Sequence, residues 1–119
     1  MAVDAGLAVR GVIETYVKAT RSGDTLLLES IFHDQAQMFG QIATREVAVP
    51  IRAYVEHVGT TQAGETYEAR IRSIEVVGTS ALAVLEARNY QGQSFVDHFS
   101  LVRVAGTWKI VCKLFAVVG

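Results

Sequence analysis

The second half of this chain is a nearly continuous run of strand-like segments separated by very short turns. The segments are rich in β-branched and aromatic residues, which favour strands, and they cover residues 66–77, 80–90, 93–104 and 107–118. Every break between them is two residues long and contains a glycine: Gly78-Thr79, Gln91-Gly92 and Ala105-Gly106. Such turns are typical of β-hairpins, so this half predicts a meander of long antiparallel strands.

The first half shows the apolar spacing of helices instead. Gly23 suits the end of one helix and Asp24 the N-cap of the next, while Pro50 suits the first turn of a third helix that Gly59 would stop. The expected elements of this half are helices over 7–21, 26–31 and 50–58 and a short strand over 35–42. Together the two halves predict an α+β fold, a cone-shaped curved antiparallel sheet or half-barrel with three helices on its concave face.

Composition narrows the class of protein. With 119 residues the chain suits one domain over residues 1–119, and half of its residues are hydrophobic, which indicates a packed core. A net charge of −1 with interspersed signs does not indicate a nucleic-acid partner. A single cysteine, Cys112, excludes an internal disulfide. Because we see no signal peptide and no stretch long enough to span a membrane, we expect a cytoplasmic protein with no membrane partner.

Asp97 is the most informative single residue. Alternation along residues 93–104 places its carboxyl group on the same face as Phe95, Phe99 and Leu101, which is the predicted buried face. A buried carboxylate without a partner is costly, so such a group is paired, protonated or part of a functional site.

The neighbour of Asp97 on the last strand depends on the register. A plain two-residue turn at Ala105-Gly106 sets Asp97 opposite Leu114 and turns Lys113 to the other face. A one-residue bulge would reverse this arrangement and bring Lys113 beside Asp97. We expect the plain register, because it places an entirely apolar series on the inner face.

The helical half of the chain contains the segments Tyr16-Val17-Lys18-Ala19, Gly23-Asp24 and Phe32-His33-Asp34-Gln35-Ala36. The strand-rich half contains Ala81-Leu82-Ala83-Val84, Tyr90-Gln91-Gly92 and Asp97-His98-Phe99. In these segments the chain resembles ketosteroid isomerase, and with it the nuclear transport factor 2-like superfamily, which includes the SnoaL and ketosteroid isomerase-like proteins. The final strands are most similar to the lumazine-binding group, in residues 97–103, 106–111 and 113–115.

This resemblance implies roles for particular residues. It matches Tyr16 to the oxyanion-hole tyrosine of the isomerase and Asp97 to its protonated aspartic acid. The catalytic base of the isomerase would fall near Gly40, where this chain offers no acid, so we do not expect steroid isomerisation by that route. The alternative is that the Tyr16 hydroxyl only satisfies Asp97 in a structural contact.

Two classes of function follow from the cone. In the first, the cone holds a small apolar pocket that binds a molecule with a carbonyl or hydroxyl group, as a binding protein or, with a base, as an isomerase, cyclase or dehydratase. The second is a filled cone whose outer sheet face is a dimerisation or partner-binding surface. A cavity of about 300 Å³ or more favours the first class. The expected pocket residues are Tyr16, Phe39, Tyr54, Phe95, Asp97 and Phe99.

Other polar residues have weaker functional interpretations. Glu86 could supply a base but more simply pairs with Arg88 at the surface, and His33 with Asp34 could sit at the rim of the cone or at an ordinary helix end. His57 is expected to be solvated.

We expect a second copy of the chain to cover the outer face of the sheet. His98 lies there among residues too apolar for full exposure, and the resemblance implies a homodimer through this face. These neighbours are Val96, Ser100, Val102 and Val104. No spacing indicates a metal site, Cys112 is interpreted as a small buried apolar residue, and we expect no cofactor.

Overall fold

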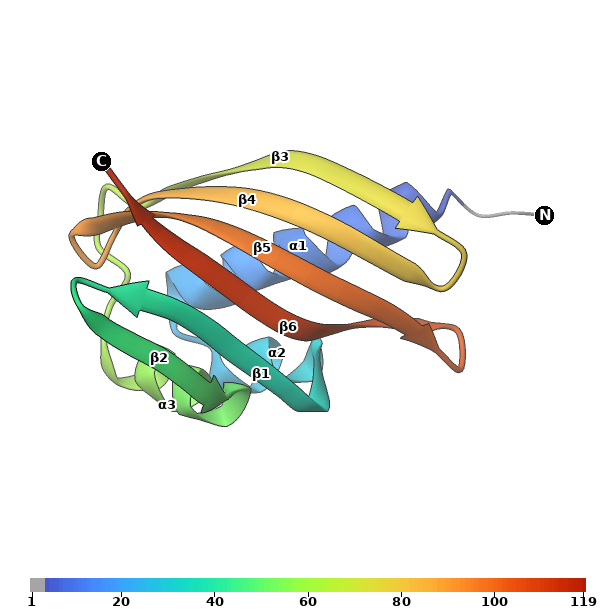
Figure 1. Ribbon diagram of the computed structural model, residues 1–119, viewed down its shortest axis with the longest axis horizontal. Coiled ribbons are helices and arrows are strands. Elements are labelled where there is room, and N and C mark those ends of the chain that lie inside the picture. Colours follow the sequence, from blue (N-terminus) through green and yellow to red (C-terminus); the bar gives the residue numbers. More distant parts are fainter. Residues whose placement is uncertain (1–3) are drawn as a thin grey trace.

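The computed structural model describes residues 4–119, which form three helices and one six-stranded sheet (Figure 1). The helices are α1 (Ala5–Ser22), α2 (Thr25–Ser30) and α3 (Ile51–Thr60). The strands are β1 (Phe32–Ile42), β2 (Arg45–Pro50), β3 (Glu68–Val77), β4 (Ser80–Tyr90), β5 (Gln93–Val104) and β6 (Thr107–Val118). The sheet order is β2-β1-β6-β5-β4-β3, and β1 runs parallel to β6 while the other neighbours are antiparallel.

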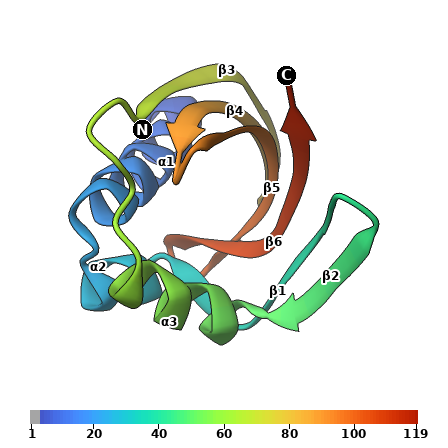
Figure 2. The same cartoon turned by 90° about the vertical axis from the view of Figure 1, so that its left-hand side faces the viewer.

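The sheet is strongly curved and does not close on itself, so it wraps around the helices as a cone (Figure 2). All three helices lie on its concave side, and the core fills the space between them and the sheet. The expected half-barrel is therefore confirmed.

The entry of the chain forms as the sequence predicts. Asp4 caps α1 by accepting a hydrogen bond from the amide of Gly6, and Gly23 ends the helix in the left-handed conformation with a φ of 70°. The Asp24 carboxylate then accepts a hydrogen bond from the amide of Leu27 at 3.0 Å, which starts α2. These caps turn the chain sharply, so that α1 and α2 pack against one another.

The predicted meander is confirmed, with β3 starting two residues later than expected. Three features of the first half differ from prediction. β1 begins earlier, at Phe32, and α3 runs through Gly59 with Pro50 as its N-cap. β2 was not predicted, because it is a short edge strand whose turn uses Ala43 at a φ of 55° in place of a glycine.

The expected register between β5 and β6 is wrong, and the bulged alternative is correct. Leu101 pairs with Ile110 but the preceding Ser100 pairs with Cys112, which leaves Val111 as the extra residue of β6. Beyond this bulge, the side chains of β6 that the plain register placed on the outer face point inward, and those that it placed on the inner face point outward. Lys113 and Phe115 point into the cone, whereas Leu114 is exposed and Cys112 is only half-buried, not fully buried as expected. The bulge thus gives the buried Asp97 a cationic neighbour and places the larger Phe115 ring in the core.

Candidate functional site

A cavity of about 360 Å³ lies at the end of the cone that carries the β1–β2 and β4–β5 hairpins. Both hairpins are on the left in Figure 1. Its rim includes Arg45 from the first hairpin, Gln91 and Gln93 from the second, and His57 from α3. Deeper in the cone the wall is aromatic, and it includes all of the chain's tyrosines: Tyr16, Tyr54, Tyr67 and Tyr90. The cone is therefore not filled by its own side chains.

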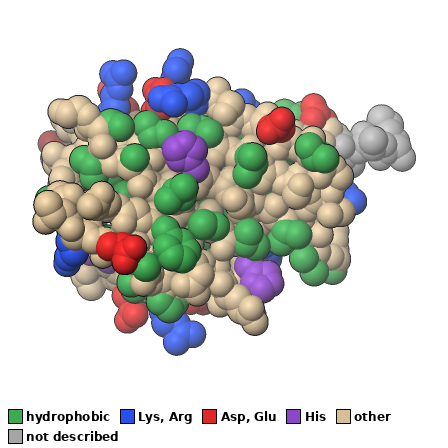
Figure 3. Space-filling model, in the orientation of Figure 1, with side chains coloured by type: hydrophobic (Ala, Val, Ile, Leu, Met, Phe, Trp, Pro, Cys, Tyr) green, Lys and Arg blue, Asp and Glu red, His purple; other side chains and the backbone are tan. Residues whose placement is uncertain are grey.

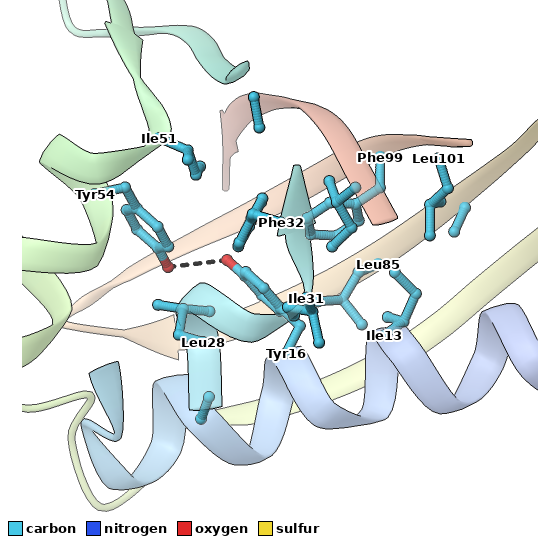
Figure 4. Close-up of a cluster of buried hydrophobic side chains, with 14 of the residues drawn as sticks. Ile13, Tyr16, Leu28, Ile31, Phe32, Ile51, Tyr54, Leu85, Phe99 and Leu101 are labelled. Atoms are coloured by element: carbon cyan, nitrogen blue, oxygen red, sulfur yellow. Dashed lines mark hydrogen bonds between the residues drawn. The ribbon is translucent and has the colours of Figure 1, made fainter. Parts of the chain in front are cut away.

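Three of the tyrosine hydroxyls form a directed chain of hydrogen bonds. The hydroxyl oxygens of Tyr16 and Tyr54 are 2.9 Å apart, and their side chains point toward each other from α1 and α3 (Figure 4). Tyr54 donates its own hydrogen to the hydroxyl of Tyr90, at 3.4 Å. Since a hydroxyl has only one hydrogen, Tyr16 must be the donor to Tyr54. Tyr90 accepts again from the side-chain amide of Gln91, so its own hydrogen is left free for a ligand.

These tyrosines are neutral donors rather than phenolates. Burial is the main cause that raises the pKa of Tyr16 and Tyr54 well above the usual value of 10.0, and the nearby Asp97 carboxyl raises both further. Burial likewise raises the pKa of Tyr67 to about 12. The cavity wall therefore offers hydroxyl donors over the whole physiological range of pH.

Asp97 and Lys113 form a buried, loosely held pair on the same wall. Their side chains belong to residues only 3% and 5% exposed, and the Lys113 Nζ lies 3.8 Å from Asp97 Oδ1. That separation is too long for a good hydrogen bond, and Oδ1 has no hydrogen-bond partner among the described residues. The other neighbours of Nζ are the sulfur of Met38, at 3.7 Å, and the ring of Tyr54, whose centre is 4.4 Å away.

Burial disfavours the charge on both partners. It raises the pKa of the Asp97 carboxyl, against the opposing effect of the Lys113 ammonium. It lowers the pKa of Lys113, against the opposing effect of the Asp97 carboxylate. The contact with the Tyr54 ring favours the ammonium by about 0.5–2 kcal/mol, but desolvating an ion costs several kcal/mol. Burial therefore disfavours the charged form of each partner, and the opposite charge of the other partner favours it.

The structure brings together four of the six expected pocket residues: Tyr16, Tyr54, Phe95 and Asp97 all line the cavity. Tyr16 bonds to Tyr54, and no hydrogen bond joins it to Asp97. The other two expectations are corrected. Phe99 lies in the core behind the wall, with its ring 4.9 Å from that of Tyr16, and Phe39 is 42% exposed on the outer face of β1.

Sequence reasoning missed Tyr90 and did not favour Lys113. Strict alternation along β4 would place Tyr90 on the face of Glu86, but Asn89, with a φ of 57°, breaks the alternation and turns Tyr90 inward. Lys113 was placed outside because of the plain register. One signal in the sequence could have revealed Lys113. The last strand carries a lysine, which the plain register placed on the face opposite Asp97 and which a bulge would bring beside that acid.

The position implied for a catalytic base is blocked by the core. A Cβ at Gly40 would overlap the ring of Phe115, so this position of β1 has no room for a side chain. Glu86 is no substitute, because it lies on the outer face, where the hydrogen bond from Arg72 at 2.8 Å lowers its pKa. Its pairing at the surface is confirmed, although the partners are Arg72 and Arg70 rather than Arg88.

The remaining histidines lie outside the deep part of the cavity. His33 and Asp34 border a separate depression beside α3, so they are not at the rim of this cavity. His57 is exposed at the rim, where its Nε2 lies 2.8 Å from the Gln91 side-chain oxygen, and His98 is exposed on the outer face as expected. Across residues 4–119 no group of three or more His, Cys, Asp or Glu side chains is placed to hold a metal ion. In the same part of the chain, no helix combines the length and the apolar character needed to cross a membrane.

Comparison with known families identifies the chain. Residues 5–116 match the protein family described as "Putative lumazine-binding". The chain belongs to this family. It is part of the nuclear transport factor 2-like superfamily, in agreement with the resemblance of its sequence. No curated protein matches the chain.

Solved structures agree on the fold over the whole chain. A nuclear transport factor 2-like protein of unknown function from Shewanella baltica superposes with a TM-score of 0.91 at 25% identity, covering 100% of this chain and 98% of the other. One from Methylobacillus flagellatus gives 0.90 at 30% identity, covering 100% and 96%. A third, from Silicibacter pomeroyi, gives 0.87 at 27% identity and covers 94% of each chain.

Proposed function

We propose that this protein binds a small, mainly apolar molecule that carries a carbonyl or hydroxyl group, inside the cavity of the cone. The observation that carries the proposal is the carboxyl group of Asp97, which belongs to a residue lining a cavity of about 360 Å³ and whose buried Oδ1 has no hydrogen-bond partner among the described residues. Buried polar atoms almost always have hydrogen-bond partners, so an incompletely bonded carboxyl group beside a cavity of ligand size supports a partner that comes from outside the chain.

The polar groups of the wall define what such a ligand presents. Tyr90 has a free hydroxyl hydrogen, and Lys113 has nitrogen-bound hydrogens without a good acceptor, so both suit a carbonyl or hydroxyl oxygen. Asp97 accepts a hydrogen bond when ionised and donates one when protonated. Around them the wall is aromatic and aliphatic, which suits a flat apolar body. The description of the family names lumazine, which is itself a small carbonyl-bearing ring compound.

A catalytic role would use the same donors. An isomerase, cyclase or dehydratase stabilises an oxyanion with donors fixed in a dry site, and Tyr16 and Asp97 were expected to act in this way. Tyr16 would act on such an oxyanion only indirectly. Tyr16 donates its hydrogen to Tyr54, and this bond orients the hydroxyl chain that ends at Tyr90. Since Gly40 leaves no room for a base, we place binding before catalysis in this proposal.

We further propose that the protein forms a homodimer through the outer face of the sheet. Large apolar side chains are exposed on this face across neighbouring strands, and Figure 3 shows apolar groups spread over the face. They include Leu82 of β4, Leu114 of β6 and Phe39 of β1. His98 stands among them, because its cross-strand partner on β6 is Leu114 and its partner on β4 is Val84. A second copy of the chain would remove this surface from water.

The binding proposal is tested by isothermal titration calorimetry with lumazine and with simple aromatic aldehydes and alcohols. We expect binding to the wild-type protein, and we expect Tyr90→Phe to weaken it about threefold to tenfold, because one hydrogen bond is lost. Glu86→Gln is the matched control on the outer face and should bind as the wild type does. Carbon-13 NMR of Asp97 provides a second measurement. A carboxyl group with an ordinary low pKa that no ligand changes would remove the proposed site.

A further inference from the structure

We propose that Lys113 is a nucleophile that forms a reversible imine with an aldehyde or ketone ligand in this cavity, with Asp97 carrying the protons. The inference rests on the proposed function and deepens it, because it narrows the ligand from any oxygen-bearing molecule to one with a reactive carbonyl carbon. It also assigns a covalent step to a residue that binding alone would not require.

The position of Lys113 supports this proposal. Lys113 is one of the residues that line the cavity, yet it is nearly fully buried, so its amino group lies beside the cavity without a shell of bulk water. The bulge at Val111 is what turns this side chain inward. A lysine that only filled space there would be an expensive choice, since an apolar residue packs against Met38 and Phe115 without any desolvation cost.

The amino group is also held only loosely by its neighbours. The distance of 3.8 Å to Asp97 Oδ1 is too long for a good hydrogen bond, and the Met38 sulfur at 3.7 Å is a weak acceptor. Among the described residues no group donates a hydrogen bond to Nζ, so the lone pair of the uncharged amine has no competing partner. The ring of Tyr54 favours the ammonium, but burial favours the amine and dominates, as the lowered pKa of Lys113 indicates. Buried lysines of this kind are the ones that form Schiff bases with carbonyl compounds.

The adjacent carboxyl group of Asp97 can transfer the protons that imine formation needs. The Nζ lone pair attacks the carbonyl carbon, a C–N bond forms, and the carbonyl π electrons move to oxygen, which takes the proton of the Asp97 carboxylic acid. The Asp97 carboxylate then removes one proton from nitrogen, which gives a neutral carbinolamine. In the last step the nitrogen lone pair forms the C=N bond, the C–O bond breaks, and the same proton leaves with the oxygen as water. The neutral amine and carboxylic acid have then become an iminium beside the Asp97 carboxylate, which stabilises it as an ion pair.

Tyr90, at the end of the hydroxyl chain, would assist the same attack on the carbonyl carbon. Tyr90 can donate its free hydrogen to the carbonyl oxygen, which makes the carbon more electrophilic. The chain has few competing amines: the other lysines, Lys18 and Lys109, lie outside this cavity, and Lys109 donates to the backbone oxygen of Ser30.

The test traps the imine in the full-length protein. The protein is incubated with benzaldehyde and cyanoborohydride at about pH 7, where exposed lysines are almost entirely protonated, and the adduct is located by peptide mapping and mass spectrometry. We expect one benzyl adduct on Lys113, formed on the order of tenfold faster than adducts on Lys18 or Lys109. Lys113→Arg should abolish it, Asp97→Asn should slow it, and Lys109→Arg, the matched control, should leave it unchanged.

Binding of benzyl alcohol, measured in parallel, separates the two proposals. If benzyl alcohol and benzaldehyde both bind but the label is confined to Lys18, Lys109 and the terminal amine, the imine is refuted and the binding site stands. If neither compound binds and Lys113 stays unlabelled, both proposals fail for this ligand class. Should Lys113→Arg not fold, the peptide map of the wild-type protein decides alone.

Discussion

At the scale of single residues, burial sets the chemistry of this site. Asp97 and Lys113 are each almost fully buried, and the low-dielectric surroundings push both toward their uncharged forms even though they are neighbours. The surrounding tyrosines respond to the same burial and keep their hydroxyl hydrogens. A single cavity wall thus holds hydroxyl donors, a carboxyl group and an amino group.

Alkaline titration tests this picture of the tyrosines. Their folded-state pKa values lie above the unfolded value near 10, so their contribution to stability is complete below about pH 10 and is lost as the pH rises through about 12. We expect little phenolate absorbance at 295 nm from the folded protein at about pH 10, and a large increase when denaturant is added. Substantial absorbance from the folded protein at that pH would contradict the buried hydroxyl chain.

At the scale of elements, the contact between β1 and β6 shapes the cavity. The bulge in β6 points Phe115 inward, and Gly40 of β1 leaves the space that its ring occupies. The two features depend on each other, because the ring could not take this place beside any residue with a Cβ. One packing contact therefore both closes the wall of the cavity and removes the position at which the related isomerase carries its base.

Substitution of Gly40 tests this contact. Gly40→Ala should lower the free energy of unfolding by about 1–3 kcal/mol through overpacking, measured by urea denaturation. The loss should shrink in a Phe115→Leu background, where the ring is gone. Gly11→Ala is the matched control: a Cβ there meets no other atom in the middle of α1, so it should stabilise the protein by about 0.5–1 kcal/mol. Equal stability of Gly40→Ala and wild type would show that the ring can move aside.

At the scale of the whole molecule, the curved sheet separates two surfaces of different character. Its concave side meets the helices (Figure 2) and borders the cavity. Its convex side exposes apolar residues to water (Figure 3). The cavity opens at the end of the cone, between the hairpins, so a partner on the convex side would leave its rim accessible.

Charge placed on the convex side tests the dimer. Leu82, which is 54% exposed on β4, is a suitable site, and Leu82→Asp should yield a monomer in sedimentation velocity because it buries a carboxylate in an apolar interface. The control is Leu26→Asp on α2, where the leucine is 80% exposed and far from the outer face of the sheet. The proposal fails if Leu82→Asp sediments like the wild type, or if the wild type is itself a monomer.

Local sequence signals were reliable wherever a structure depends on neighbouring residues. Helix caps at Gly23 and Asp24, the two-residue hairpins and the burial of Asp97 all follow from short-range patterns, and all were confirmed. Of the expected pocket residues, Tyr16, Tyr54, Phe95 and Asp97 lie on the cavity wall. Local signals did not place Lys113 and Tyr90 there, because an irregularity within a strand moves the later side chains to the opposite face.

The sequence by itself determined the α+β cone, its helical entry, its meander and the presence of one acid on the inner face. Those features are encoded in periodicity and turn chemistry, which act over a few residues. Only the tertiary structure decided that Lys113 stands beside Asp97, that Tyr90 turns inward and that Phe115 fills the space above Gly40. These outcomes depend on which of two registers packs better against distant strands, and no local pattern measures that packing energy.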